Sequence, residues 1–257
     1  LVPLVSGEDI RRCHIRSGTN FLLYPYKSDQ YGTVRPYTEE ELSESFPKAW
    51  NYLQSYRQQL SERGLEANQT WYAYSRSQNL GVSSRPKILV REMMPRAEFA
   101  ADCEGKFAFC SGYALLALNM NSGDLRLWAA ILSTPTMEFA LRHSGTELHS
   151  GWFRLLKHHL QTVRLPLLSS RAYKQASNLV AELYIDPVAK SVWSELDDIV
   201  ARSFNLITSE RNAIKQFLND CHSRSIPSNN EQASSMIFTL NSQVGNVLAI
   251  GPGAISK

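Results

Sequence analysis

A nearly continuous apolar run over residues 113–118 leads into a longer apolar segment, and this pair constrains the fold most. The run is typical of a strand buried on both faces, although a buried helix turn has the same pattern. Pro135 and the hydroxyl residues Ser133 and Thr134 before it predict that one core helix ends there and a second begins. The apolar residues at mostly helical spacing that predict these helices are Leu125, Trp128, Ala129, Leu132, Phe139 and Leu141.

Size and charge set only broad limits. A chain of 257 residues forms one large domain or two smaller ones, and its net charge of +3 is too small to identify a partner. The sequence shows no signal peptide and no apolar run long enough to span a membrane, so we expect a soluble, cytoplasmic protein with no membrane partner. Because the chain starts at Leu1 and not at methionine, we expect a fragment of a longer polypeptide.

The cysteines are predicted to be reduced thiols. None of the four is part of a Cys-x-x-Cys pair. Cys103 and Cys110 flank Gly105 in a segment, 99–113, whose pattern indicates a hairpin, so these two could approach each other. A bridge between them would matter only in an oxidising compartment. The other two are Cys13 and Cys221.

The order of predicted elements indicates an α+β fold. Helices and several strands alternate up to residue 165, where Thr38 is a predicted helix N-cap. From Ser169 on, the pattern is helical, and Asp186-Pro187 is predicted to start one of these helices. We therefore predict a mixed-sheet subdomain over 1–165, a helical subdomain over 166–224, and a linker with a C-terminal tail of uncertain packing over 225–257.

Residues with catalytic or metal-binding chemistry do not combine into a recognisable site. His158 and His159 are adjacent, so on a helix they point about 100° apart and cannot share a metal ion. The acidic residues Glu195, Asp197 and Asp198 are most simply the solvated face of a helix. The sequence has no Gly-x-Ser-x-Gly motif, and Gly251-Pro-Gly253 lacks the strand-before, helix-after setting of a phosphate loop. We predict no catalytic residue and no metal site, with a free-standing hydrolase as a distant possibility.

A local excess of basic residues lies between Tyr74 and Ala97, where Glu92 is the only acid. Arginine pairs bidentately with guanine edges or phosphates, and tyrosine and glutamine add stacking and hydrogen bonding. The alternative is a solvated sheet edge on which charge prevents aggregation, and composition alone favours this alternative. The candidate DNA-binding residues are Arg76, Arg85, Lys87, Arg91, Arg96, Tyr74 and Gln78.

Strand geometry divides these candidates into two roles. Alternate strand residues point to opposite faces, so if Ile88 and Val90 are buried, Lys87 and Arg91 face outward. We therefore predict that Lys87 and Arg91 contact phosphates. Arg76 and Arg85 bracket a predicted loop, 77–84, that could enter a groove and read bases.

Taken in order, the landmarks of residues 1–222 resemble the C-terminal specificity region of adenine-specific DNA methyltransferases with a TaqI-like C-terminal domain. That group includes single-chain restriction–modification enzymes. One small departure is Leu132-Ser133-Thr134, where the family usually has Leu-Asn-Ser. The landmarks are Gly7-x-Asp9-Ile10, Leu23-Tyr24-Pro25-Tyr26, Phe46-Pro47-x-Ala49-x-x-Tyr52-Leu53, Leu60-x-x-Arg63, Trp71, Lys87-Ile88, Phe99, Asp102, Gly105, Tyr113, Leu165-Pro166, Leu196-Asp197-x-x-Val200 and Phe204-x-Leu206-x-Thr208-x-x-Arg211.

The resemblance implies a division of labour within a longer enzyme. In that family an upstream domain binds S-adenosylmethionine and carries an Asn/Asp-Pro-Pro-Tyr/Phe motif that holds the flipped adenine. This chain lacks the motif, because Asp186-Pro187 is followed by Val188. The resemblance thus implies a fragment with no cofactor of its own, whose partners are double-stranded DNA and the upstream methyltransferase domain of the same polypeptide.

Two functions from different classes follow. The first is sequence-specific recognition of duplex DNA as the specificity region of an adenine-N6 methyltransferase or a fused restriction–modification enzyme, in which the parent chain is the methyltransferase and sometimes also an endonuclease. The second is a protein-interaction module that does not bind DNA, on which the basic residues only aid solubility. An upstream Asn/Asp-Pro-Pro-Tyr/Phe motif in the complete reading frame would favour the first function, and its absence would favour the second.

Overall fold

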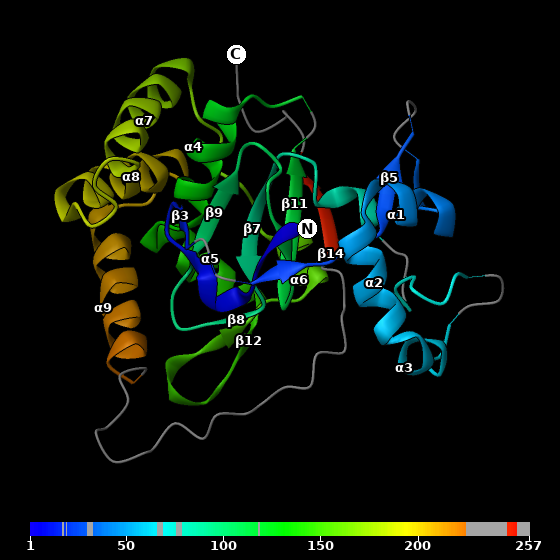
Figure 1. Ribbon diagram of the computed structural model, residues 1–257. Helices are drawn as coiled ribbons and strands as arrows, with labels where there is room; N and C mark the ends of the chain where they lie inside the picture. Colours follow the sequence, from blue (N-terminus) through cyan, green and yellow to red (C-terminus); the bar gives the residue numbers. More distant parts are fainter. Residues whose placement is uncertain are drawn as a thin grey trace.

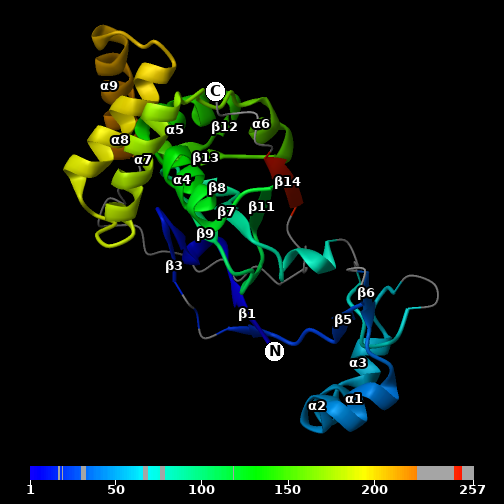
Figure 2. The same ribbon diagram turned by 90° about the horizontal axis from the view of Figure 1, so that it is seen from above.

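A computed structural model describes the chain over residues 1–16, 18, 20–29, 33–65, 69–75, 79–117, 119–224 and 246–250, with 117 and 246–250 described for the backbone alone. It has an α+β fold, as predicted. A central sheet lies in the middle, the helices of residues 170–224 lie to one side, and a small lobe made of the described residues between 23 and 75 lies to the other (Figures 1 and 2).

The central sheet has the strand order β14-β11-β7-β9. β7 (Lys87–Arg91) pairs antiparallel with β9 (Phe99–Asp102) and with β11 (Gly112–Ala117), whereas β14 (Asn246–Ile250) is parallel to β11. The predicted central strand is thereby confirmed. Its alternate residues enter two separate apolar clusters, with Tyr113 and Leu115 in one and Ala114 and Leu116 in the other, so the strand is buried on both faces.

Two core helices cover the first face, and they break where the sequence predicts. α4 (Ser122–Leu132) begins after the N-cap Asn121, and α5 (Pro135–Ser144) begins after Thr134, whose hydroxyl accepts from the Met137 N–H. Between them the buried Ser133 hydroxyl accepts from the Phe99 N–H at 3.0 Å and donates to the Ala129 carbonyl at 2.8 Å. The helix break therefore also ties α4 to β9.

Two of the C-terminal helices share this same core. α7 (Ser170–Leu183), α8 (Lys190–Ser203) and α9 (Thr208–Arg224) follow one another. The apolar residues of α7 and α8 belong to the cluster that contains Ile88 and Trp128. The predicted boundary at 165/166 therefore runs through one continuous core.

One helix start differs from the prediction. α8 begins at Lys190, with Ala189 as its N-cap, and not at Pro187. The Asp186 carboxylate instead accepts from the Val188 N–H at 3.1 Å, which closes a local turn. Short polar side chains of this kind stabilise turns as readily as helix starts, and the sequence pattern does not distinguish the two.

The second face of the sheet is covered by the first strands of the chain, β1 (Val2–Val5), β2 (Ile10–Arg11) and β3 (His14–Ile15), with a 3-10 turn, η1 (Gly7–Asp9), between β1 and β2. β1 lies between β4 (Phe21–Leu22) and β10 (Ala108–Phe109).

The predicted hairpin over 99–113 is wrong, because β9 pairs with β7 and β10 pairs with β1. All four cysteines are free thiols.

The small lobe is built around aromatic side chains. It contains β5 (Tyr26–Ser28), β6 (Val34–Pro36), α1 (Glu39–Ser45), α2 (Pro47–Ser55) and α3 (Arg57–Ser61). Thr38 is the N-cap of α1 in a capping box with Glu41, as predicted. Two small clusters, one around Tyr26 and one around Tyr72, hold the lobe together. The 3-10 turn η2 (Leu80–Val82) follows it.

A small three-stranded sheet completes the fold. It has the order β12-β13-β8, from Thr146–Glu147, Phe153–Arg154 and Met93–Met94. The 3-10 turn η3 (His149–Gly151) precedes β13, and α6 (Lys157–Thr162) follows it. No helix in the described part of the chain combines the length and apolar character that crossing a membrane needs.

Replacing Gly105 by alanine should destabilise the fold. Gly105 has a φ of +63°, and a Cβ there would lie 2.5 Å from the backbone carbonyl of Ser84. Left-handed backbone and a rigid clash together are expected to lower the free energy of unfolding by about 1–3 kcal/mol in urea denaturation. Gly64→Ala is the matched control, because a Cβ there meets nothing within 4 Å. Equal midpoints for the two variants would contradict this prediction.

Candidate nucleic-acid interface

The predicted DNA-binding residues do not form one surface. Arg76 and Gln78 lie outside the described residues. Arg85 precedes β7, whereas Arg91 ends β7 and Arg96 lies in the loop between β8 and β9. Because a strand rises about 3.3 Å per residue, Arg85 and Arg91 are roughly 15–20 Å apart, at opposite ends of the central sheet.

Lys87 is not a phosphate-contacting residue on the surface, and the prediction of its role is wrong. Its side chain is 0% exposed, and its ammonium donates to Asp102 Oδ2 at 2.5 Å and to the Ser83 and Arg85 carbonyls at 2.9 and 3.3 Å. These three partners use all the donors of an ammonium group. Burial lowers the pKa of Lys87, and Asp102 opposes this shift. Lys87 faces outward only if one face of the sheet is bare, and here both faces are covered.

Tyr74 is also used inside the protein. Its hydroxyl donates to the Leu23 carbonyl at 2.5 Å, and its ring lies 5.0 Å from that of Tyr26 and 6.2 Å from that of Tyr24. Burial raises the pKa of its phenol, with Tyr26 and Tyr24 adding to the shift. Tyr74 therefore holds the small lobe together, and its ring is not displayed for stacking on a base.

Arg91 is partly available. Its side chain is 13% exposed, contacts Glu98 at 3.4 Å, and lies with its guanidinium 5.3 Å from the centre of the Trp152 ring. Burial lowers the pKa of Arg91, and the neighbouring Arg11 contributes to the lowering. Arg91 is thus held against Glu98 and the Trp152 ring, with only a small part of its side chain exposed.

Arg96 is the most accessible of the candidates at this end of the sheet. It is exposed, while Met94 and Ala97 on either side of it are 0% exposed. Among the described residues, its side chain has no hydrogen bond or ion pair. Arg12 lies beside this loop, because its Nε donates to the carbonyl of Ala97, the residue after Arg96, at 3.4 Å. Burial lowers the pKa of Arg12, and Arg96 adds to this effect.

The structure therefore gathers an arginine cluster, which we define as Arg11, Arg12, Arg91 and Arg96. Two of its members were predicted, and Arg11 and Arg12 were missed. They come from the β2–β3 hairpin, about 80 residues earlier in the chain. The adjacent Arg11-Arg12 pair was their only sequence signal. Arg96 is the exposed member, whereas the side chains of Arg12 and Arg91 are 23% and 13% exposed and lie beside Glu138 and Glu98. The cluster can therefore bind phosphate or a guanine edge mainly through Arg96.

Arg85 occupies a second basic position at the other end of β7. It is exposed, and within the described parts of the chain its side chain has no ion pair or hydrogen bond. The backbone of its loop is fixed by two contacts. The Arg85 carbonyl accepts from Lys87, and Gly105 packs against the backbone of Ser84 and Arg85. The exposed Lys106, paired with Glu104 at 2.7 Å, belongs to the neighbouring loop.

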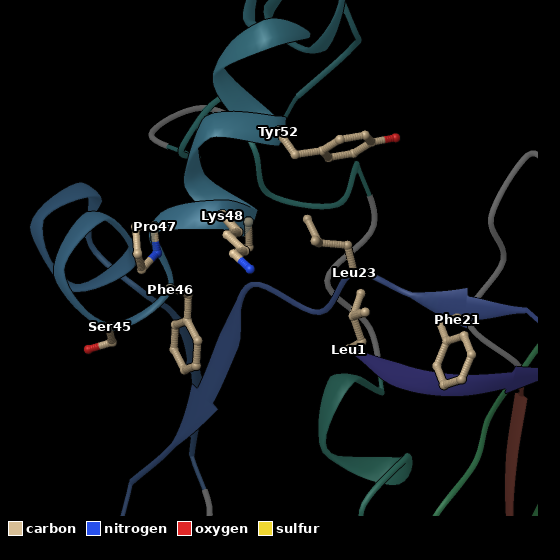
Figure 3. A pocket seen from close by; sticks show the side chains of 9 residues that line it. Leu1, Phe21, Leu23, Ser45, Phe46, Pro47, Lys48 and Tyr52 are labelled. Atoms are coloured by element: carbon tan, nitrogen blue, oxygen red, sulfur yellow. The ribbon is translucent and has the colours of Figure 1, made fainter.

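An apolar groove lies at the edge of the small lobe (Figure 3). It has a volume of about 710 Å³ and is formed between the α1–α2 turn and β4. Phe21, Phe46 and Tyr52, which are 58%, 46% and 58% exposed, line it together with Leu23. Exposed apolar surface of this kind commonly marks a protein-interaction site.

The described residues hold no group of three or more His, Cys, Asp or Glu side chains arranged to bind a metal ion.

One acidic side chain differs from its prediction. Asp197 is not on a solvated face but is 6% exposed, and it accepts from the Thr136 N–H at 2.7 Å at the start of α5. Burial raises the pKa of Asp197, which the Thr136 bonds oppose. Its role is to join α8 to α5.

No protein-family model matches this chain.

Proposed function

We propose that this chain recognises duplex DNA as the specificity region of an adenine-N6 methyltransferase or a fused restriction–modification enzyme. The observation that carries the proposal is the arginine cluster around the exposed Arg96. Arginine is the side chain best suited to bidentate contacts with phosphate and guanine. The resemblance of the ordered landmarks to those of TaqI-like specificity regions is a second reason for the proposal.

The two basic positions suit a duplex. Arg85 and the arginine cluster lie roughly 15–20 Å apart along β7, which corresponds to about four to six nucleotides of one DNA strand at 3.4 Å each. In this proposal the cluster contacts phosphates and Arg85 reads bases. S-adenosylmethionine would bind the upstream methyltransferase domain of the same cytoplasmic polypeptide, and this chain would supply no catalytic group.

Replacing Arg96 by alanine should weaken binding to every duplex. We expect the slope of log affinity against log salt to fall by about one unit, because one phosphate contact is lost. Binding of fluorescent 30-base-pair duplexes with randomised sequence, measured by anisotropy across salt concentrations, tests this.

Replacing Arg85 by alanine should instead weaken the binding free energy by about 1–3 kcal/mol, and only on sequences that the wild type selects from the random pool.

Lys174→Ala provides the control, because Lys174 is exposed on α7 outside the arginine cluster. It should leave affinity and salt slope nearly unchanged. If Arg96→Ala and Lys174→Ala behave alike, the cluster is only a solvated surface and DNA recognition through it is wrong.

The apolar groove favours a second candidate function, a protein-interaction module without DNA binding. Its exposed aromatic residues are typical of interface anchors. The duplex titration separates the two functions. Absence of wild-type binding to any duplex at low salt would favour the interaction module.

A further inference from the structure

The loop that carries Arg96 is held on both sides by one buried ion pair of α5. Glu138 Oε2 accepts from the Ala97 N–H at 3.1 Å, and Arg142 Nη2 donates to the Pro95 carbonyl at 2.5 Å. Pro95 and Ala97 are the two neighbours of Arg96 in the chain. The backbone is thus fixed directly before and directly after the exposed guanidinium-bearing residue.

Glu138 is itself oriented by several partners. It is 0% exposed, and its Oε1 accepts from Arg142 Nε at 2.9 Å and lies 2.7 Å from His222 Nε2. Arg12 of the arginine cluster lies 3.6 Å from Oε2. A buried carboxylate with this many partners has one preferred position, so the bond to Ala97 has a fixed direction.

Arg142 uses the whole guanidinium fork. In addition to Glu138 and Pro95, it donates through Nη1 to the Gly151 carbonyl at 3.0 Å, and it lies 4.4 Å from the centre of the Phe153 ring. A lysine at this position would keep the charge, but its donors all lie on one nitrogen and cannot span the acceptors that Arg142 reaches through Nε, Nη1 and Nη2. Lysine would therefore release Pro95 or Gly151.

We propose that the Glu138–Arg142 pair is a positioning device that presents Arg96 to a phosphate of duplex DNA. The inference rests on the proposed function, because it assigns Glu138 and Arg142 to the same DNA-binding site. Neither residue contacts DNA in this mechanism. A fixed loop orders Arg96 before binding, so that less conformational freedom is lost when the contact forms.

A double-mutant cycle tests this positioning role. Arg142→Lys should weaken binding of the randomised 30-base-pair duplex about threefold to tenfold in the wild-type background. In the Arg96→Ala background it should have little further effect, because the side chain that the pair positions is gone. Equal losses in both backgrounds would mean that Arg142 only supports the fold, and the proposal would be overturned.

Amide hydrogen exchange without DNA gives the second readout. Arg142→Lys should speed exchange at Ala97, whose N–H donates to Glu138, while amides of β7 and β11 keep wild-type rates. His222→Gln, at a side chain that is 17% exposed, is the second variant if Arg142→Lys fails to fold. It should show the same loop-specific change to a smaller degree.

The two readouts separate the two proposals. A wild-type chain that binds no duplex overturns the proposed function together with the DNA role of the pair, whatever the exchange rates. A chain that binds duplex DNA, but whose variants keep wild-type exchange in the Arg96 loop, overturns the positioning role and leaves DNA recognition standing.

Discussion

Replacing Asp102 by alanine is expected to lower the free energy of unfolding by about 3–5 kcal/mol. The substitution leaves the ammonium of Lys87 buried without its counter-charge, since the two side chains are 0% and 2% exposed. It also removes the acceptor for the Lys106 and Phe107 N–H groups, which donate to Asp102 at 2.9 and 3.1 Å. Urea denaturation monitored by tryptophan fluorescence measures the loss.

A charge-free double variant gives the sharpest control. Lys87→Met with Asp102→Asn removes both charges and keeps one amide oxygen for the loop. Because the loss in Asp102→Ala comes mainly from an uncompensated buried charge, the double variant should recover much of it. Glu104→Ala, which breaks an exposed pair with Lys106 in the same loop, should cause no measurable change. A loss in Asp102→Ala as small as in Glu104→Ala would show that the pair is not buried in solution.

The Lys87–Asp102 pair also explains why the role of Lys87 could not be predicted from strand alternation. Alternation identifies an exposed face only when one face of the sheet is bare. The three consecutive apolar residues 88–90 were the local sign that β7 is covered on both faces. The covering residues, such as Val5 and Ile10, lie some 80 residues earlier in the sequence, so the burial of Lys87 depends on non-local packing.

Local signals in the core were sufficient to predict the elements beneath the site. Thr134 and Pro135 mark a helix start because a capping hydroxyl and a proline at the first position both act within one turn. The strand β11 was predictable for a similar reason, since an apolar run on both faces needs no knowledge of its partners. Helix and strand positions in the core were therefore mostly right.

Contacts between distant segments decided the rest. The arginine cluster joins the β2–β3 hairpin to the end of β7 and the loop before β9, and no sequence period links these segments. The predicted hairpin over 99–113 failed for the same reason, because β1 supplies the partner of β10 from the start of the chain. The candidate site thus depends on tertiary pairing that a single sequence does not encode locally.

Replacing Glu138 by glutamine is expected to be strongly destabilising at neutral pH and much less so in acid. At pH 7 the loss should be about 3–5 kcal/mol, because Arg142 and Arg12 lose a buried counter-charge. Burial alone would raise the pKa of Glu138, but His222, Arg142 and the Ala97 N–H outweigh it, so the folded pKa lies below its ordinary value.

The sign of the pH dependence follows from this lowered pKa. The stability that Glu138 contributes is complete above its unfolded pKa of about 4.3 and is lost as pH falls through the lower folded value. Urea denaturation of wild type and Glu138→Gln between about pH 3 and 7 should therefore give curves that run parallel above about pH 5 and converge below it. Glu104→Gln, at an exposed carboxylate, should follow the wild type throughout. Curves that stay parallel to pH 3 would mean that Glu138 is not held ionised by its partners. The carboxylate that accepts from the Ala97 N–H would then lack the negative charge that strengthens this hydrogen bond.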